Sequence, residues 1–428
     1  MSREFFDTGI PWIGTIPKNW SIQQVKSAFE FKKSKAKQEK PVILSLARDA
    51  VKIRDISNNE GQLAESYIDY NPVDFGDFLL NPMDLYSGAN CNVARVKGVI
   101  SPAYINLRAR NGINPFYYDF YFKIQYWHMA MFAHGKGVSF DHRWTINKAD
   151  VLKYWIPKLS FNEQNKIVEL INKKLEQIDK LLSLQEQQIE KLKDYKQSII
   201  SNLVTKGLSG HASFKESGIE WIGMIPTHWE IRRLKNCISR KLEYGANASG
   251  SAFDESLPRY IRITDISLDN ELKDTDKLSL SENDSSSYIL HDGDVLFARS
   301  GATVGKSFLY KKEYGRSAFA GYLIRATVDR NVLSSEYLYY FTLSNEYWEW
   351  AKGIFIQATI QNIGANRYAN MPLTVPPLDE QDKIIEKIKK FESNIKLTLR
   401  LIEKKIEKLN EYKKSLIYEY VTGKLEAI

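Results

Sequence analysis

The chain has 428 residues, of which 43% are hydrophobic and 12% aromatic, and its formal net charge is +8. The chain is longer than a domain with a single hydrophobic core normally is, and its apolar content is too high for a disordered chain. Two or more packed domains are therefore expected. Two cysteines are too few for a disulfide framework, no apolar run is long enough to span a membrane, and the first residues lack a signal-peptide pattern, so we expect a cytoplasmic protein.

The first element along the chain is a short segment that occurs twice. TGIPWIGTIPKNWSIQQVKS at 8–27 matches SGIEWIGMIPTHWEIRRLKN at 217–236 with ten identities in twenty positions and no gap. Such a match indicates internal duplication. The tryptophans of the two copies are predicted to be apolar anchors that attach each segment to a helix end, rather than ligand-stacking groups; they are Trp12, Trp20, Trp221 and Trp229.

A variable module follows each copy, at roughly 28–157 and 237–374. Both modules contain short β-rich runs separated by Gly, Asn and Asp, followed by aromatic-rich helical stretches such as FYYDFYFKIQYWHMAMF and SSEYLYYFTLSNEYWEWAK. FGDFLLNPMDLYSG at 75–88 corresponds loosely to DGDVLFARSGATVG at 292–305 through a shared Gly-Asp pair. We therefore predict a mixed α and β module in each half.

Each module is followed by a long segment, 163–205 and 380–422, with 21 identities in 43 positions and neither proline nor glycine. Apolar residues recur there at alternating steps of three and four, as on one stripe of a heptad seam. A pseudo-twofold axis between the halves would make the two helices antiparallel with facing stripes; packing of each helix on its own module is the alternative. The predicted helix–helix seam consists of Ile171, Ile178, Leu182, Ile189, Leu192, Ile199, Ile388, Ile395, Leu399, Ile402, Ile406, Leu409 and Leu416.

These patterns predict the fold class α+β. Two pseudo-repeated α/β modules are expected to be separated by a long antiparallel two-helix coiled coil, in a circular pseudo-twofold organisation that places the chain termini side by side. The predicted limits are 1–157 and 209–374 for the modules, each with its tryptophan segment, and 158–208 and 375–428 for the helices.

Catalytic, metal and cofactor motifs are not found in the sequence, so we expect neither a catalytic residue nor a bound cofactor. The six histidines lack a metal-ligand spacing, and neither HExxH nor GxSxG occurs. SGATVGKS at 300–307 resembles a phosphate-binding loop, but Gly301 and Gly305 enclose three residues where that loop needs four. A tight turn that exposes Arg299, Thr303 and Lys306 is the favoured interpretation.

The net positive charge favours a polyanionic partner without requiring one. Both modules carry Arg, Lys, Asn and Gln near predicted turns, and such side chains can hold phosphates and read base edges, although any single one is more often a solvated surface group. The candidate DNA contacts are Lys33, Lys35, Arg48, Lys52, Arg54, Asn90, Asn92, Arg95 and Lys97 in the first module. In the second they are Arg259, Arg262, Arg299, Thr303, Lys306, Arg316, Gln357, Gln361, Asn362 and Arg367.

The order of these elements resembles the specificity subunit of type I restriction–modification systems. The resemblance is carried by the repeated WIGxIPxxW, by VPPLDEQDKIIEKI at 375–388 and IPKLSFNEQNKIVELI at 156–171, and by the helix ends LVTKG and YVTGK. The longer and less proline-rich boundary of the first copy departs from the family pattern and leaves the module edge between 152 and 162 open.

Membership of this family implies two target-recognition domains, each reading one half of a bipartite asymmetric site on double-stranded DNA. It also implies two methyltransferase subunits bound to the helices and restriction subunits joined through the complex, with no membrane partner. The alternatives are a coiled-coil protein-interaction adaptor without DNA specificity, a nucleotide hydrolase built on SGATVGKS, and a DNA reader of another modification system.

Overall fold

A computed structural model describes residues 3–32, 34–37, 41–56, 66–83, 85, 91–138, 144–208, 213–267, 270–301, 303–356 and 362–427. The chain forms two units, one made of 1–185 with 404–428 and the other of 186–403, and each is described by itself. Among the described residues, no helix combines the length and apolarity needed to cross a bilayer.

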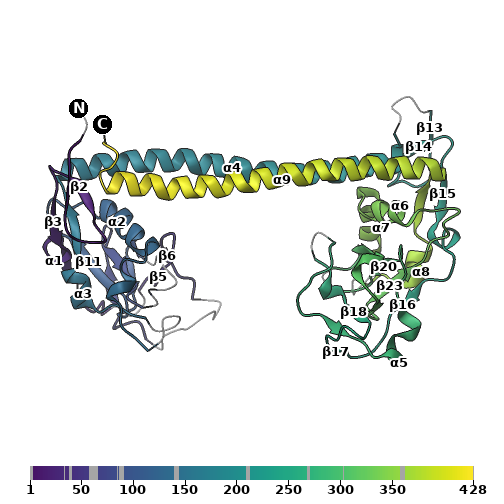
Figure 1. The fold of residues 1–428 in the computed structure, drawn as a ribbon, viewed down its shortest axis with the longest axis horizontal. Coiled ribbons are helices and arrows are strands. Elements are labelled where there is room, and N and C mark those ends of the chain that lie inside the picture. The colour runs from purple at the N-terminus through teal and green to yellow at the C-terminus, as the bar shows by residue number, and fades with distance from the viewer. Residues whose placement is uncertain are drawn as a thin grey trace. The chain divides into compact units, whose positions relative to one another are not determined.

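Unit 1 is built on a four-stranded antiparallel sheet in the order β4 (Phe29–Phe31), β11 (Ile105–Ala109), β8 (Phe78–Leu80), β9 (Cys91–Val93). The helix α2 (Pro115–Trp127) packs its buried tyrosines and phenylalanines against this sheet, so the aromatic stretch is core, as helical periodicity with bulky apolar residues requires. The remaining elements are β1 (Phe5–Asp7), β2 (Thr15–Pro17), β3 (Ser21–Gln24), α1 (Val25–Ala28), β5 (Leu44–Leu46), β6 (Val51–Ile53), β7 (Asn71–Val73), β10 (Gly98–Ile100), η1 (Phe132–His134), α3 (Lys148–Lys153) and β12 (Trp155–Lys158) (Figure 1).

Unit 2 repeats this plan with a sheet in the order β16 (Glu243–Tyr244), β23 (Leu323–Ala326), β20 (Val295–Ala298), β21 (Ser307–Leu309). A second sheet in the order β17, β19, β18, β22 has no counterpart of equal size among the described residues of unit 1. The other elements are β13 (Phe214–Glu216), β14 (Met224–Pro226), β15 (Glu230–Arg233), η2 (Leu234–Asn236), β17 (Ser251–Ala252), β18 (Arg259–Ile261), η3 (Ile263–Asp265), β19 (Leu278–Ser279), α5 (Glu282–Ser285), η4 (Ser286–Tyr288), η5 (Lys312–Tyr314), β22 (Ser317–Phe319), α6 (Ser335–Thr342), α7 (Asn345–Ile356), α8 (Ala365–Ala369) and β24 (Pro372–Val375).

The shared Gly-Asp pair makes the same turn in both sheets. In unit 1 the buried Asp77 accepts a hydrogen bond from the backbone N–H of Asp74 at 2.8 Å. In unit 2 the buried Asp294 accepts one from the N–H of His291, also at 2.8 Å. A buried carboxylate costs free energy unless it is hydrogen-bonded, so this pair explains why the duplication kept an aspartate before the central strand.

In unit 1 the first part of α4 (Phe161–Lys206) and the last part of α9 (Leu378–Val421) run antiparallel. Arg3 bridges Glu163 near the start of α4 and the carbonyl of Gly423 after the end of α9, and farther along the pair Lys413 Nζ lies 2.6 Å from Asp179 Oδ1. The contact of Arg3 with Gly423 brings the two ends of the chain together within this unit, as predicted.

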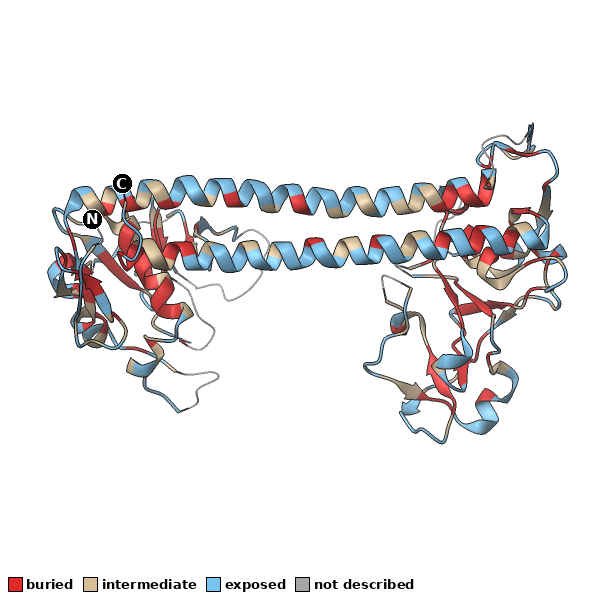
Figure 2. Ribbon diagram, turned by 45° about the horizontal axis from the view of Figure 1, so that its top comes forward, coloured by how far each residue is buried: buried red, intermediate tan, exposed pale blue. Residues whose placement is uncertain are grey.

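In unit 2 the last part of α4 and the first part of α9 are likewise antiparallel. Lys196 Nζ lies 2.9 Å from Glu392 Oε1, and the rings of Tyr195 and Phe391 are 5.4 Å apart. Along the helices of the two units, buried and half-buried positions recur between exposed ones (Figure 2). Of the predicted seam, Ile171, Ile178, Ile388, Ile395, Ile402 and Leu416 are buried, and Leu182, Ile189, Leu192, Ile199, Leu399, Ile406 and Leu409 are half-buried.

The second tryptophan of each repeated segment packs on the glycine that ends a long helix. Gly423 follows α9 with φ +73°, and a Cβ there would lie 3.0 Å from the ring of Trp20; Gly207 follows α4 with φ +75°, and a Cβ there would lie 3.0 Å from Trp229. A left-handed glycine is a common helix C-terminus, and the space above it is filled by a tryptophan in both units. Unit 1 therefore uses the end of α9, and unit 2 uses the end of α4.

Two further hydrogen bonds, one in each unit, show the same exchange of helix ends between the two halves of the sequence. The buried hydroxyl of Tyr117 donates to the carbonyl of Val421 at 2.8 Å, and that of Tyr337 donates to the carbonyl of Val204 at 2.9 Å. The predicted α+β class and antiparallel helix pairing are thus confirmed within each unit.

The first tryptophans of the segments behave differently. Trp12 is half-buried, donates from Nε1 to the carbonyl of Trp155 and stacks on Tyr154 with ring centroids 4.8 Å apart. Trp221 is 39% exposed, so its predicted anchoring role is wrong. The residue that takes the place of Tyr154 in the second copy is Met371, which offers no ring for stacking.

Candidate nucleic-acid interface

Three adjacent strands of unit 2 end or begin at the same end of the sheet. Ala298 at the end of β20 pairs with Leu323 at the start of β23, and Tyr244 at the end of β16 pairs with Ile324. Arg299 follows β20, and its N–H donates to the carbonyl of Tyr322 just before β23 at 3.0 Å. The antiparallel register therefore gathers Tyr244, Arg299 and Tyr322 from three separate stretches of sequence.

Three predicted DNA contacts of unit 2 are already engaged with protein groups. Arg262 Nη2 lies 2.7 Å from Asp265 Oδ1, and Arg316 Nη2 donates to Glu282 Oε2 at 2.6 Å, which lowers the pKa of the Glu282 carboxyl. Arg259 is buried and donates to the carbonyl of Lys273. Arg259 is therefore a structural residue, which corrects the prediction, because a buried guanidinium cannot reach a groove.

Three other predicted cations have no carboxylate partner among the described residues, namely Arg299, Lys306 and Arg367. Lys306 lies beside Arg299 across the β20–β21 turn, because its carbonyl accepts from the N–H of Ala298 at 2.8 Å. Arg367 is exposed on α8, whose first residue Ala365 donates its N–H to the hydroxyl of Tyr244 at 2.9 Å. We call Arg299, Lys306 and Arg367, with Tyr244 and Tyr322, the basic end of unit 2.

The guanidinium of Arg299 is held by an aromatic ring. Its Cζ lies 4.9 Å from the centroid of the Tyr244 ring, and its Nε is buried without a hydrogen-bond partner among the described residues. A cation–π contact orients the side chain but consumes none of its N–H donors. The terminal nitrogens thus remain available for an acceptor outside the chain.

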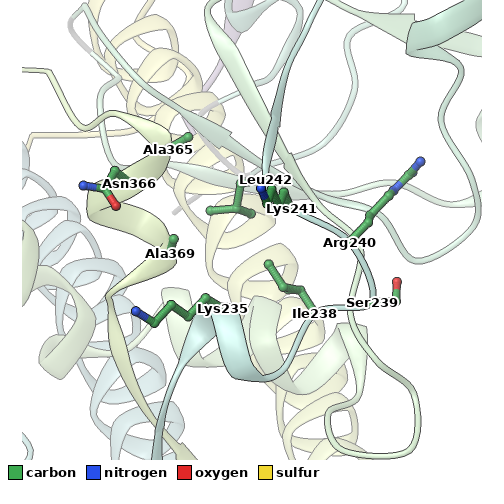
Figure 3. Close-up of a pocket in the computed structure, with 9 residues that line it drawn as sticks. All are labelled: Lys235, Ile238, Ser239, Arg240, Lys241, Leu242, Ala365, Asn366 and Ala369. Carbon is green, nitrogen blue, oxygen red and sulfur yellow. The ribbon is translucent and has the colours of Figure 1, made fainter.

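A shallow pocket of about 460 Å³ lies between α8 and the segment that enters the module, and its lining residues are Lys235, Ile238, Ser239, Arg240, Lys241, Leu242, Ala365, Asn366 and Ala369 (Figure 3). These residues include three cations and no carboxylate. Arg240 extends from the loop and donates from Nε to Thr327 Oγ1 at 3.0 Å. Arg240 also lies 3.8 Å from Glu243 Oε2, so Lys235 and Lys241 supply most of the positive charge that the pocket offers to a ligand.

Two of the remaining predicted contacts of unit 2, Thr303 and Asn362, lie around the same turn. Asn362 is exposed and forms a β-bridge with Ser300, whereas Thr303 is half-buried with a hydroxyl that lacks a hydrogen-bond partner in the described chain. Gln357 and Gln361 lie outside the described residues.

The SGATVGKS segment lies in a β-hairpin between β20 and β21. A phosphate-binding loop instead joins a strand to a helix, whose N-terminus faces the phosphates. The hairpin geometry removes the nucleotide-hydrolase alternative.

In unit 1 three of the predicted contacts lie on or next to the hairpin of β5 and β6. Arg48 is exposed in its turn, Lys52 is exposed on β6 with a surface ion pair to Asp49, and Arg54 is half-buried after β6. Ile53 between them is 63% exposed.

Other candidates of unit 1 lie elsewhere. Arg95 is exposed and packs 4.8 Å from the Phe116 ring, Lys97 is exposed, and Lys35 forms a surface ion pair with Asp69. Asn92 is buried and donates to the carbonyl of Ala47 at 2.7 Å, so its prediction as a DNA contact is corrected to a structural role. Lys33 and Asn90 lie outside the part of the chain that the structure describes.

Comparison with known proteins shows which family the chain resembles. A sequence model of the type I restriction modification DNA specificity domain matches residues 257–410. The type I restriction enzyme MjaVIII specificity subunit of Methanocaldococcus jannaschii is 24% identical over 353 residues, which cover 80% of this chain and 78% of the relative. The EcoBI specificity subunit of Escherichia coli is 21% identical over 100% of this chain and 90% of its own. The chain is thus similar to type I restriction enzyme specificity subunits over most of its length.

Solved structures share the fold of this chain. A chain from a structure of complex assembly and conformational transition in a type I R-M system has a TM-score of 0.68 at 14% identity and covers 96% of this chain and 99% of that chain. The HsdS subunit from Thermoanaerobacter tengcongensis has a TM-score of 0.53 at 14% identity, with coverages of 96% and 98%.

Sequence reasoning missed the aromatic part of the candidate site. Tyr322 is 65% exposed and Tyr244 is 43% exposed, and neither was among the predicted contacts. A signal was present, since each tyrosine adjoins a glycine, in EYGAN and AGYL, and a tyrosine at a glycine turn points outward more often than one inside a periodic run.

Proposed function

We propose that this chain is the DNA-reading specificity subunit of a type I restriction–modification complex. Unit 1 and unit 2 each read one half of a bipartite, asymmetric site on double-stranded DNA, and the complex restricts or modifies DNA at that site. The observation that carries the proposal is the basic end of unit 2, where unpaired cations and exposed tyrosines converge on one end of a sheet. Such a surface can hold phosphates and reach base edges.

The asymmetry of the target follows from the chemistry of the two units. Both keep the Gly-Asp turn and the tyrosine that contacts a helix end, so their scaffolds are equivalent. Their exposed polar groups differ, since unit 1 presents a basic hairpin and unit 2 a basic sheet end. Because the two units have equivalent scaffolds but different exposed polar groups, they are expected to read different DNA sequences in the two half-sites.

The helices supply surfaces for partner subunits. Leu184 in unit 1 is 48% exposed, and Leu401, at the corresponding position of the second copy, is 60% exposed in unit 2. Leucines at matching places on otherwise charged faces fit two copies of one partner, which supports two methyltransferase subunits bound to the two units. The partner subunits carry out the reaction on the DNA, and this chain selects the DNA sequence at which they act.

Methylome sequencing of the host with and without this gene tests the proposal. The expected result is one bipartite, non-palindromic motif whose methylation disappears with the gene. Binding of the assembled complex to that duplex should weaken steeply with salt, because phosphate contacts release counterions. An unchanged methylome, or binding that does not respond to salt, would refute DNA reading by this chain.

A further inference from the structure

The duplication allows each residue of unit 2 to be compared with the residue at the equivalent position of unit 1. The N–H of Ile363 donates to the carbonyl of Arg299 at 2.9 Å, and the N–H of Ile146 donates to the carbonyl of Pro82 at 2.9 Å. Both pairs stand 217 positions apart in the two copies. Positions 82 and 299 therefore have the same backbone role, whereas their side chains are proline and arginine. The scaffold does not need an arginine at this place.

Arg299 differs from the arginine that the scaffold does need. Arg325 on β23 is buried, donates to the carbonyl of Ile289 at 2.6 Å and forms an ion pair with Glu243. Arg299 is half-buried at the strand end, and its guanidinium has no hydrogen bond or ion pair within the described chain. Its hydrogen-bonding capacity is unused by the fold.

Tyr244 holds this guanidinium in place. Its ring lies under Arg299, and its hydroxyl is fixed by the N–H of Ala365. A planar guanidinium stacked on a fixed ring loses little conformational freedom when it binds a planar acceptor pair.

Tyr322 and Asn247 extend the surface beside Arg299. Tyr322 follows Gly321, whose N–H donates to the carbonyl of Ala246 at 2.8 Å. A Cβ at Gly321 would collide with Asn247 Oδ1, so the exposed amide of Asn247 lies directly against the Tyr322 turn. An exposed ring and an amide thus accompany the free guanidinium.

We propose that Arg299 reads a guanine in the half-site of unit 2, with Tyr244 as its positioning residue and Tyr322 as a neighbouring contact. The inference rests on the proposed function and names the residue that gives unit 2 its base preference. Arginine donates two parallel hydrogen bonds to O6 and N7 of guanine in the major groove. Lys306 and Arg367 flank this contact and hold phosphates, which carry no sequence information.

The test uses the full chain in complex with its methyltransferase subunits and the duplex that methylome sequencing identifies. Each position of the unit 2 half-site is replaced in turn by the other three base pairs, and dissociation constants are measured. The wild-type complex is expected to prefer guanine at one position by about 5- to 150-fold, the range of a bidentate base contact. Arg299→Ala should abolish that preference and leave every other position, and the unit 1 half-site, unchanged.

Matched variants separate base reading from other roles. Tyr244→Leu should reduce the same guanine preference while lowering the melting temperature by no more than about 4 °C, since Tyr244 is exposed and loses one hydrogen bond, that from the N–H of Ala365. Lys306→Ala should weaken all duplexes alike and reduce the salt slope by about one. Arg316→Ala, which removes an arginine already paired with Glu282, should change nothing.

Two outcomes overturn the inference. Retention of the guanine preference in Arg299→Ala shows that another group reads the base, and an equal loss on every duplex shows that Arg299 binds phosphate. A wild-type complex without any base preference in this half-site would instead contradict the proposed function itself, so the two failures are distinguishable.

Discussion

Gln381→Met tests whether one buried amide joins the module of unit 2 to its helix. Gln381 is fully buried near the start of α9; its Nε2 donates to the carbonyls of Val332 and Pro376 at 3.0 and 2.8 Å, and its Oε1 accepts from the N–H of Ser334 at 2.8 Å. Methionine keeps the length and volume but none of these hydrogen bonds. Three buried bonds at about 1 kcal/mol each, less the gain from burying a thioether, give a loss of about 2–3 kcal/mol.

Calorimetry and hydrogen exchange measure the effect on the full-length chain. At about 2–4 °C per kcal/mol, the melting transition of unit 2 should fall by about 4–12 °C, and the Ser334 amide should lose its protection. Gln185→Met is the matched control, because Gln185 is buried in the helix seam without a hydrogen bond to the described chain and should tolerate the change. A fall below about 1 °C in Gln381→Met would refute the reasoning.

Two other substitution and labelling experiments follow from the same contacts. Gly423→Ala places a Cβ 2.5 Å from Pro17 Cγ, whereas Gly14→Ala meets no atom within 4 Å, so in urea unfolding the first should cost more than the ~1–2 kcal/mol left-handed penalty that both share; equal costs would contradict the packing. Burial raises the pKa of the Cys237 thiol to about 11 and that of Cys91 well above its usual range, so iodoacetamide at pH 8 should label neither cysteine until urea unfolds the chain, as mass spectrometry would show.

The order of the modules and the pairing of the long helices could be predicted from the sequence because both halves of the chain repeat the same segments. Ile178 and Ile395 occupy matching heptad positions, and heptad periodicity survives in sequence because each turn of helix must present the same face. The attachment of the tryptophan segments to helix ends was also predicted, but the residue on which each tryptophan packs was not. That Trp20 packs on Gly423 and Trp229 on Gly207 depends on contacts between distant segments, which no local pattern encodes.

The sequence predicted which residue types form the candidate site, but not which individual residues belong to it. Arg259 and Arg299 were predicted as DNA contacts for the same reason, their positive charge. The structure distinguishes them, because Arg259 is buried and donates to a carbonyl, whereas Arg299 stacks on a tyrosine and its donors are free. The convergence of Tyr244, Arg299 and Tyr322 arises from strand register, and register is set by packing over the whole sheet.

The hydrogen bond from Tyr117 to Val421 has a consequence for synthesis of the protein, since it joins residues 304 positions apart. At about 5–20 residues per second, a ribosome needs about 15–60 s to make the intervening chain. Until then the nascent first half exposes the apolar face that Ile417 and Val421 later cover. The second half draws its partners from 186–403 alone, so its core does not depend on the last residues of the chain. The half of the chain that is made first therefore depends on the segment that is made last. Its apolar face, which Ile417 and Val421 cover in the folded protein, is the surface that a chaperone would protect during synthesis.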